Sequence, residues 1–381
     1  MTMLIEVEGI GFPNKGAELM LCGVESQLRE KYRDDVQVCC RPWQGHKESY
    51  RLLGNRNILQ LGYLTYKGIR LDGLFNCLPL KITETFGIAR AKDVDVVLDA
   101  SGLRYSDSWG PKASRAAALR YGKLKKRGKK IIILPQAFGP FKNPEVGSAV
   151  REIVELSDLC FARDEVSYRY LVELCGEDVK IQQAPDFTNL VEPISAFGGS
   201  EFYGKVIIIP NQRMVDKTDK SVADNYFKYL LNLCTYLREL GEDVIILNHE
   251  GKPDHMICMR LSKACGNLPV ITHWDPVYIK TAIGCCKLLV SSRFHGCVSA
   301  LSQGIPVIAT SWSHKYEMLL KEYGVEDYLV HLSSDAVDAK MVHSALQGSA
   351  SRQIAAEAGL LKLKSKDMWS DVFKFLSSHS L

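Results

Sequence analysis

Short apolar runs rich in β-branched residues alternate along this chain with longer segments that carry apolar residues at helical spacing. The short runs predict strands at 3–8, 36–40, 94–99, 130–134, 159–162 and 180–182, and again at 205–209, 243–247, 269–271, 287–291 and 306–310. The longer segments predict helices, for example at 17–31, 145–157, 165–174, 224–240 and 354–376. Such alternation is typical of β-α-β units with a parallel sheet, so the sequence predicts an α/β fold.

Local signals mark the ends of several elements. Asp164 is a suitable N-cap for helix 165–174, and Gly176 lies just past the end of that helix. The N-terminal apolar run contains acidic residues and lacks a basic start, which predicts a first strand and not a signal peptide. A chain of 381 residues is long enough for two domains, and the proline, glycine and serine residues at 191–200 mark the predicted boundary.

Composition narrows the class of protein. Hydrophobic residues make up 46% and charged residues 24% of the chain, as in soluble globular proteins. The formal net charge of +4 is small for this length, which argues against a nucleic-acid partner and suits anionic small molecules. The 12 cysteines show no C-x-x-C spacing and several lie in apolar segments, so a reducing cytoplasm is the expected location. No segment is long enough to predict a membrane span.

The segment 288–296 carries the strongest chemical signal, because Arg293 and His295 come just after an apolar strand. A strand at 287–291 and a helix at 296–302 would place both side chains at the carboxyl edge of a parallel sheet, where such sheets bind ligands. The helix start adds unpaired N–H groups and the positive end of a dipole. We therefore predict an anion site that contains a proton carrier. The alternative is that Arg293 caps a neighbouring element and His295 is a core histidine.

Polar loops follow other predicted strands in the same way. The loop at 11–18 is bracketed by glycines and joins the first strand to the first helix, but it lacks the G-x-G-x-x-G pattern of dinucleotide sites. The loop at 99–107 combines charge, hydroxyl and glycine, and Gln136 in the loop at 135–141 can both donate and accept hydrogen bonds. These loops would lie at the same edge of one sheet.

Arg163 repeats the arrangement of Arg293 in the other half of the chain, since it follows a strand and precedes a capped helix. Two such arginines could face each other across an interdomain cleft. The alternative is an exposed ion pair of Arg163 with Asp164 or Glu165, which would stabilise the fold little.

Other chemistries find less support. His249, His255, Cys258 and Cys265 lie close in the chain but fit no standard zinc spacing, so no metal is predicted. No G-x-S-x-G elbow occurs. The basic run at 123–130 is better explained by a solvated helix end than by a nucleic-acid or membrane surface. The amphipathic segment 361–369 leaves peripheral contact with a membrane open.

Several of these segments together resemble the polysaccharide pyruvyl transferase family. The resemblance covers most of the chain. Its motifs are Asn14-Lys15-Gly16-Ala17-Glu18, the Asp99 loop, Leu134-Pro135-Gln136 with Gly139-Pro140-Phe141, Arg163-Asp164 with Ser167, Ala184-Pro185-Asp186, Arg293-Phe294-His295-Gly296, Gly304-Ile305-Pro306 and Lys315. The chain departs from the commonest forms at Ser101-Gly102, where two glycines are usual, and at 14–18, which replaces a glycine-aspartate version.

The resemblance implies an architecture similar to that of B-type glycosyltransferases. Two Rossmann-like domains would face a central cleft: an N-terminal domain at 1–192 on the acceptor side and a C-terminal domain at 201–350 with the donor anion site. Residues 351–381 would form a C-terminal helix that packs back on the first domain.

The resemblance also implies a reaction. The pyruvyl group of phosphoenolpyruvate would be transferred to two hydroxyls of a hexose in a surface or capsular polysaccharide precursor, which gives a cyclic ketal and releases phosphate. Phosphoenolpyruvate is then a co-substrate and no cofactor is expected. The acceptor would be a free or a polyprenyl diphosphate-linked sugar, handled in the cytoplasm or at the inner face of the membrane. The identity of the hexose, its two hydroxyls and the oligomeric state stay open.

Site residues follow position by position from the same resemblance. Arg163, Arg293 and His295 match donor-site residues, and Lys315 matches a recurring lysine that we assign to the donor side. Residues assigned to the acceptor side are Asn14, Lys15, Glu18, Asp107, Gln136 and Asp186.

The chemistry of phosphoenolpyruvate agrees with these assignments. Two arginines and a helix N-terminus suit the phosphate and carboxylate of the donor. His295 would either deprotonate the acceptor hydroxyl or protonate the departing phosphate. Glu18, Asp107 and Asp186 are unranked candidates for the acid at the methylene carbon or for binding sugar hydroxyls.

Two rival functions remain. The first is a glycosyltransferase that uses a nucleotide sugar, whose diphosphate Arg293 and His295 would bind. The second is a sugar-binding or scaffold protein without activity on the same fold.

Overall fold

The computed structural model describes residues 2–12, 14–42, 47–62, 65–66, 69–70, 73–177 and 180–378. Pro13, in the predicted loop 11–18, lies outside the described residues. Contacts divide the chain into two compact units. Unit 1 contains Met1–Pro13, Met20–Phe187 and Lys366–Leu381, and unit 2 contains Asn14–Leu19 and Thr188–Ser365. The main change of unit therefore falls between Phe187 and Thr188, a few residues before the sequence boundary at 191–200.

Unit 1 is built on a parallel sheet, in which the described residues form eight strands in the order β10-β9-β8-β7-β1-β2-β3-β6. These are β1 (Met3–Glu8), β2 (Val36–Cys40), β3 (Leu59–Leu61), β6 (Ile88–Ala89), β7 (Val96–Asp99), β8 (Lys130–Gln136), β9 (Leu159–Ala162) and β10 (Ile181–Gln183). A separate antiparallel pair consists of β4 (Thr65–Tyr66) and β5 (Ile69–Arg70). The central strands are almost fully buried, as expected for a sheet covered on both faces.

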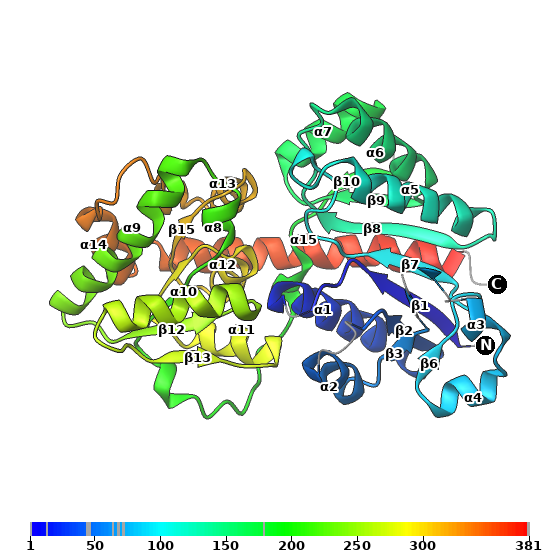
Figure 1. Ribbon diagram of the computed structural model, residues 1–381, viewed down its shortest axis with the longest axis horizontal. Coiled ribbons are helices and arrows are strands. Elements are labelled where there is room, and N and C mark those ends of the chain that lie inside the picture. The colour runs from blue at the N-terminus through cyan, green and yellow to red at the C-terminus, as the bar shows by residue number, and fades with distance from the viewer. Residues whose placement is uncertain are drawn as a thin grey trace. The chain divides into compact units, whose positions relative to one another are not determined.

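Helices cover both faces of this sheet (Figure 1). They are α1 (Lys15–Tyr32), α2 (Lys47–Asn55), α3 (Gly73–Cys77), α4 (Leu80–Thr85), α5 (Pro111–Lys125), α6 (Pro144–Leu156) and α7 (Glu165–Cys175). Helices α1 and α2 lie on one face, whereas α5, α6 and α7 lie on the other, because the strand order reverses between β1 and β7 and parallel crossovers are right-handed. The carboxyl ends of β1 and β7 are therefore the switch point of unit 1.

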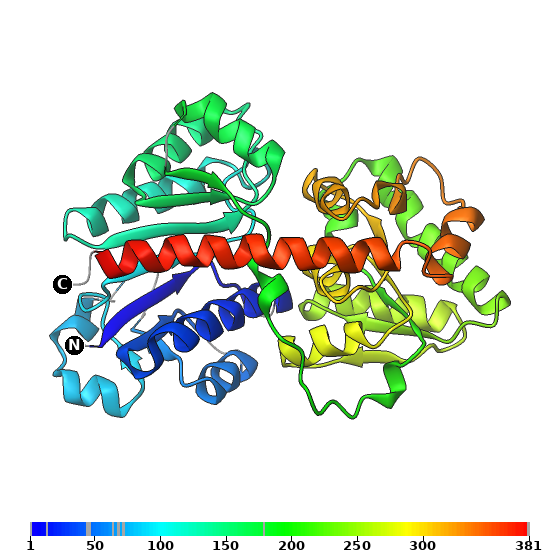
Figure 2. The same ribbon diagram turned by 180° about the vertical axis from the view of Figure 1, so that it is seen from behind.

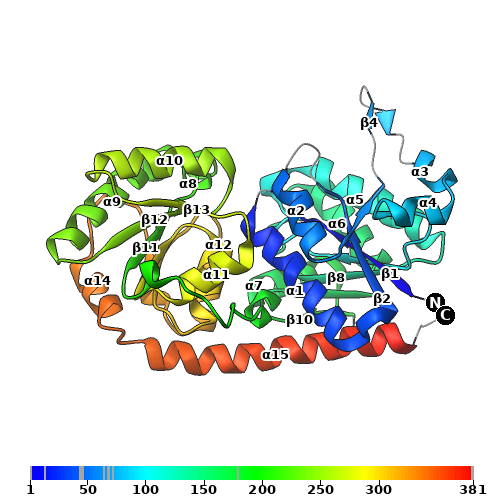
Figure 3. The same cartoon turned by 90° about the horizontal axis from the view of Figure 1, so that it is seen from below.

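Unit 2 repeats the design with the strand order β13-β12-β11-β14-β15-β16 among its described residues. Its strands are β11 (Val206–Ile209), β12 (Val244–Asn248), β13 (Val270–Thr272), β14 (Leu288–Ser291), β15 (Val307–Thr310) and β16 (Leu329–Val330). Its helices are α8 (Arg213–Asp216), α9 (Lys220–Glu239), α10 (Gly251–Ala264), α11 (Pro276–Gly284), α12 (Phe294–Leu301), α13 (Lys315–Glu322) and α14 (Ala339–Leu346). Figure 3 shows α9 and α10 on one side of the strands and α11 and α12 on the other. The switch point of unit 2 lies between β11 and β14.

Helix α15 (Ser351–Ser378) is one long continuous helix, shown in red in Figure 2. Its residues up to Ser365 belong to unit 2, and those from Lys366 onward belong to unit 1. In unit 1, the Trp369 ring packs edge-on against Phe187 at 6.0 Å between centroids, and Phe373 packs edge-on against Tyr32 at 5.7 Å. The C-terminal helix thus packs on the first domain, as the family resemblance implies.

The predicted α/β architecture is confirmed, and the bounds of β1, β2 and β9 coincide with the predicted ones. Five further strands were not predicted, namely β3, β4, β5, β6 and β16. Each of these strands has only two or three residues, which is too short to show an alternating pattern.

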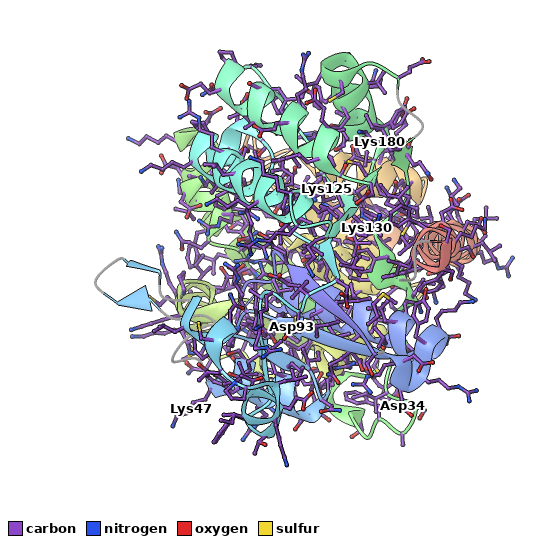
Figure 4. All side chains as sticks on the ribbon, turned by 90° about the vertical axis from the view of Figure 1, so that its right-hand side faces the viewer. Asp34, Lys47, Asp93, Lys125, Lys130 and Lys180 are labelled. Carbon is purple, nitrogen blue, oxygen red and sulfur yellow. The ribbon has the colours of Figure 1, made fainter. Side chains whose placement is uncertain are left out.

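The basic run at 123–130 lies at the end of α5 and the start of β8. The Nζ of Lys125 contacts Asp158 Oδ1 at 2.8 Å, and the Nζ of Lys130 lies 5.8 Å from the centroid of the Phe375 ring. Figure 4 labels Lys125, Lys130 and Lys180 at the end of unit 1 where the parallel strands begin. These cations therefore lie at the edge of the sheet opposite to its carboxyl ends.

The cysteines and the character of the helices bear on the class of protein. All 12 cysteines carry free thiols. Several of them, among them Cys160, Cys234 and Cys297, are buried in the cores, where they act as small apolar side chains. None of the described helices combines the length and the apolar character that a membrane span requires.

Candidate active site

The loop after β14 anchors the predicted anion site at the switch point of unit 2. Helix α12 begins at Phe294, two residues before the predicted start at Gly296, and Arg293 occupies its N-cap position. The earlier start follows from Ser291, whose hydroxyl accepts a hydrogen bond from the Arg293 N–H at 3.0 Å and turns the chain. Asn211, which follows β11, donates its amide to the Ser292 carbonyl at 2.6 Å. Both switch strands therefore hold this loop in place.

The guanidinium of Arg293 contacts two carboxylates on and before α10. Its Nε donates to Asp254 Oδ2 at 2.7 Å, and Nη2 lies 2.5 Å from the same oxygen. Its Nη1 donates to Glu250 Oε2. Burial alone would lower the pKa of Arg293, but Asp254 and Glu250 raise it above its ordinary value. Arg293 is thus a permanently charged group that already has two anionic partners.

His295 lies in the first turn of α12 and packs against the start of α1. A β-carbon added at Gly16 would lie 2.3 Å from His295 Nδ1 and 2.8 Å from its Cβ, so only glycine fits there. The side chain of Asn14 accepts hydrogen bonds from the N–H groups of Gly16 and Ala17 at 3.0 and 3.3 Å, which fixes this first turn. The imidazole is therefore packed between two helix N-termini.

Lys15 and Glu18 form a buried ion pair on the same turn of α1. The Nζ of Lys15 donates to both Glu18 oxygens at 2.8 and 2.9 Å, and to the Trp274 carbonyl at 3.0 Å. The backbone N–H of Lys15 donates to the His249 carbonyl at 3.3 Å. These bonds explain why the segment Asn14–Leu19 belongs to unit 2, whereas the sequence analysis placed it in the N-terminal domain.

His249 is a second imidazole at this site. It follows β12, is only 4% exposed, and its Nδ1 has no hydrogen-bond partner among the described residues. Burial, followed by the charges of Arg293, His295 and Lys15, holds the pKa of His249 well below its ordinary value of 6.5. His249 is therefore a neutral imidazole at physiological pH.

Lys315, the first residue of α13, lies among three aromatic rings of unit 2. Its Nζ is 4.4 Å from the ring centroid of Trp312, 5.3 Å from that of Phe294 and 5.5 Å from that of Tyr316. Cations are attracted to aromatic faces at such distances. Because Phe294 is the first residue of α12, this arrangement positions a positive charge near the start of that helix.

Arg163 and Asp186 form a buried ion pair at the carboxyl edge of the sheet in unit 1. The Nη1 of Arg163 donates to Asp186 Oδ2 at 3.0 Å, and the side chains are 3% and 5% exposed. The neighbouring Asp164 caps α7, since its carboxylate accepts from the Ser167 N–H at 2.8 Å. The pair joins the end of β9 to the loop after β10.

Gln136 and Asp107 also lie at this edge of the sheet. Gln136 is the last residue of β8, so the strand extends into the predicted loop 135–141, and Asp107 begins a short 3-10 helix between β7 and α5. The Gln136 carbonyl accepts from the Arg163 N–H at 2.9 Å, and its fully buried side-chain amide has no hydrogen-bond partner among the described residues. Asp107 accepts from the N–H groups of Lys142 and Asn143 at 2.8 and 3.3 Å, just before α6. Asp107 therefore holds a loop, and Gln136 lies beside Arg163.

An ionic network that the sequence analysis did not identify lies at the switch point of unit 1. Glu6 and Glu8 on β1 contact Arg120 on α5, with Nη2 2.6 Å from Glu6 Oε2, and Arg104 reaches Glu8 Oε1 at 3.0 Å. Burial raises the pKa of Glu6, whereas for Glu8 Arg120 and Arg104 outweigh burial and lower the pKa. Next to them, Asp99 accepts from the hydroxyls of Tyr105 and Tyr121 at 2.5 and 2.7 Å.

The predicted residues thus form two groups, one in each unit. Unit 2 brings together the predicted residues Asn14, Lys15, Glu18, Arg293, His295 and Lys315, and adds His249, Glu250, Asp254 and Trp274. Unit 1 contains Arg163, Asp186, Gln136 and Asp107. The signal for His249 and Glu250 was present in the sequence, since both directly follow the apolar strand β12 as Arg293 follows β14.

Among the described residues, no group of three or more histidine, cysteine, aspartate or glutamate side chains is arranged to hold a metal ion. His249 and His255, which are close in sequence to Cys258 and Cys265, therefore belong to no such group.

Comparison with known proteins gives a family and a fold. A family model described as polysaccharide pyruvyl transferase matches residues 14–314. The UDP-GlcNAc 2-epimerase of Neisseria meningitidis bound to UDP-GlcNAc is similar in structure, with a TM-score of 0.60, 14% identity and coverage of 98% of this chain and 99% of that one. Anabaena HepE in complex with UDP has a TM-score of 0.56, 14% identity and coverage of 99% and 100%. A putative UDP-N-acetylglucosamine 2-epimerase of Listeria monocytogenes has a TM-score of 0.59, 12% identity and coverage of 94% and 91%. These similarities show a fold of the B-type glycosyltransferase kind.

Proposed function

Because the chain belongs to the polysaccharide pyruvyl transferase family, we propose that it transfers the pyruvyl group of phosphoenolpyruvate to two hydroxyls of a hexose in a surface or capsular polysaccharide precursor. The product is a cyclic ketal, and phosphate is released. The observation that carries this proposal is the position of Arg293 and His295, which adjoin at the end of switch strand β14 and at the start of α12. A parallel sheet binds its ligand at this point.

The reaction needs balanced proton transfers. Two C–O bonds form at C2 of the donor, and the C–O bond to phosphate breaks. The methylene carbon gains one proton and becomes a methyl group, while the two hydroxyls lose theirs, so one proton leaves with the phosphate. His295 either deprotonates an attacking hydroxyl or protonates the departing phosphate, since an imidazole can do both near neutral pH.

Fixed positive groups stabilise the donor in this proposal. The first N–H groups of α12 and the positive end of its dipole meet the phosphate. Lys315 adds an ammonium near the same helix start. Arg163 is assigned to the donor by its match to the family motif, and its hydrogen bond to Asp186 orients the guanidinium.

The residues assigned to the acceptor side form two groups, one in each unit. Lys15 and Glu18 adjoin His249 and Trp274 in unit 2, near the imidazole of His295. Asp107, Gln136 and Asp186 line the carboxyl edge of unit 1. The reaction takes place in the cytoplasm in this proposal, with a lipid-linked or free sugar as acceptor and without a metal or other cofactor.

Mass spectrometry tests the proposal directly. A panel of hexoses and lipid-linked glycans is incubated with phosphoenolpyruvate and the protein, and the ketal mass is expected for the true acceptor. His295→Ala and Arg293→Ala should each lower turnover by about 10² to 10⁴. His343→Ala, at a histidine of α14 that bonds the Tyr236 hydroxyl, is the matched control and should turn over like the wild type. Near-normal turnover of both site variants would contradict the assignment.

The second candidate is a nucleotide-sugar glycosyltransferase, which the fold of the B-type glycosyltransferase kind favours. A thermal-shift titration separates the two. Stabilisation by phosphoenolpyruvate and not by nucleoside diphosphate sugars supports the pyruvyl donor, and the reverse supports the rival. Release of phosphate only when donor and acceptor are both present would exclude a protein without activity.

A further inference from the structure

Two carboxylates of different character hold the guanidinium of Arg293. Asp254 is fully buried, takes both Nε and Nη2, and also accepts from the Gln212 N–H at 2.9 Å. Glu250 takes only Nη1, and its side chain is 24% exposed. Asp254 is thus built into the core of unit 2, whereas Glu250 reaches Arg293 from the surface.

The two side chains that pair with Arg293 are both negatively charged, which is unfavourable for a site that binds anions. One guanidinium faces two carboxylates, and the nearby Lys15 is already neutralised by Glu18. These five side chains together carry a net negative charge, although the β14–α12 turn and the nearby Lys315 otherwise suit an anion. A ligand that carries a phosphate and a carboxylate would meet a like charge at Glu250, which opposes binding.

The backbone allows the Glu250 side chain to move alone. Glu250 pairs with Asn14 in an isolated antiparallel bridge, and the neighbouring His249 carbonyl accepts from Lys15. At the N-cap position of α10, the carboxylate makes no capping hydrogen bond. Among the described residues, the Glu250 carboxylate hydrogen-bonds only to Arg293, so a change of side-chain rotamer leaves the backbone and the helix intact.

We propose that Glu250 is a displaceable carboxylate that occupies the position of an anionic ligand group on Arg293. An incoming phosphate or carboxylate takes Nη1 from Glu250, while Asp254 keeps the guanidinium in place. This inference rests on the proposed function in naming a doubly negative ester as the ligand. It makes Glu250 a residue that determines specificity, because a ligand has to supply a stronger anion than a carboxylate in order to displace it.

Displacement of Glu250 by the ligand predicts a different effect on anion binding than a purely structural role of Glu250 does. If Glu250 competes with the ligand, its removal should tighten anion binding, whereas the loss of a structural ion pair would weaken it. The dissociation constants of inorganic phosphate and phosphoenolpyruvate are measured by titration calorimetry for the full chain. Glu250→Gln should bind both about tenfold more tightly, a change that corresponds to about 1.4 kcal/mol.

Two further variants isolate the effect. Glu250→Asp keeps the charge but shortens the reach to Arg293, so it should also bind more tightly, by a smaller factor. Glu242→Gln removes the same charge from unit 2 at the start of β12, where Glu242 pairs with Lys287 at 2.6 Å. Its dissociation constants should stay within about twofold of the wild-type values, because Glu242 precedes β12 whereas Glu250 follows it, and salt screens the interaction between well-separated charges.

The outcomes separate this inference from the proposed donor. Tighter phosphate binding by Glu250→Gln without any binding of phosphoenolpyruvate supports the displaceable carboxylate and contradicts the donor. Wild-type turnover with phosphoenolpyruvate, together with unchanged or weaker binding by both Glu250 variants, overturns the inference and leaves the function intact. Absence of anion binding by all the proteins overturns both.

Discussion

Gly16 and His295 are in such close contact that the position of a β-carbon on residue 16 lies 2.3 Å from the imidazole Nδ1. Residue 16 is in the first turn of α1, a position where alanine would ordinarily be favoured over glycine. The glycine is therefore retained against helix propensity, and the feature that requires it is the imidazole. This contact also joins the first turn of α1 to the first turn of α12, which are far apart in sequence.

Gly16→Ala should impair the site while leaving the fold intact. The methyl group would push the His295 ring away from its position, and we expect turnover to fall at least about tenfold, since general acid–base catalysis depends on hydrogen-bond geometry. Turnover is measured as phosphate release from phosphoenolpyruvate in the presence of the acceptor. Gly359→Ala is the matched control, because nothing lies within 4 Å of the position of its β-carbon in the middle of α15.

The control variant at Gly359 also has an expected effect on stability. Gly359→Ala should raise the free energy of unfolding by about 0.5–1 kcal/mol through helix propensity and leave turnover unchanged. Equal turnover of Gly16→Ala and Gly359→Ala would show that the His295 ring can move without cost to the reaction.

Removal of Asp186 should strongly destabilise unit 1. Asp186→Ala leaves the Arg163 guanidinium, which is 3% exposed, without its carboxylate at 3.0 Å. Breaking a buried ion pair by removal of one partner costs about 3–5 kcal/mol of the free energy of unfolding, which denaturant titration measures. Glu145→Ala is the control, because the Arg115–Glu145 pair is more than half exposed on both sides and should contribute less than about 1 kcal/mol. Similar losses in both variants would contradict a buried Arg163 pair.

Lys315 should contribute to donor binding through its charge. Lys315→Met keeps an apolar stem against Trp312, Phe294 and Tyr316 but removes the ammonium, so we expect the dissociation constant of phosphoenolpyruvate to rise about tenfold. Stability should change by only about 1 kcal/mol, the usual size of a cation–π contact. Lys321→Met on the exposed side of the same helix is the control. If the two variants bind phosphoenolpyruvate equally, Lys315 has no role in binding the donor.

The parts of the fold that were predictable are those with local signals. Helix α7 has its N-cap at Asp164 and its end at Gly176, as predicted, because capping depends only on residues a few positions apart. The fully buried strands gave continuous apolar runs. The early start of α12 was missed because the hydroxyl of Ser291, and not a typical cap at residue 295, turns the chain.

The candidate site was less predictable, because its contacts join different loops of the sheet. Arg293 and His295 could be identified from one segment, but the partners of Arg293 are 39 and 43 residues earlier in the chain. Which loops meet at one edge depends on strand order, and no local pattern states that β14 pairs with β11 and not with β13. That the segment Asn14–Leu19 belongs to unit 2 depends on long-range contacts of the same kind.

His249 should make the stability of the protein depend on pH below about 6.5. In the folded protein, burial and the charges of Arg293, His295 and Lys15 hold the pKa of His249 well below 6.5, whereas the unfolded chain takes up the proton near that value. The unfolded state then binds more protons as the pH falls, so the free energy of unfolding drops by up to about 1.4 kcal/mol per pH unit. Above this range, His249 is neutral in both states and adds no pH dependence.

Urea unfolding of the wild type and of His249→Gln at pH 7.5 and 5.5 measures this contribution. The wild type should lose about 1 kcal/mol more than His249→Gln between the two pH values, since the variant has no imidazole to protonate at this position. His255→Gln, on the neighbouring helix α10, is the control and should follow the wild type. If the wild type and His249→Gln lose the same free energy of unfolding between the two pH values, the folded protein takes up the proton as readily as the unfolded chain does. The surrounding cations then do not keep this imidazole neutral.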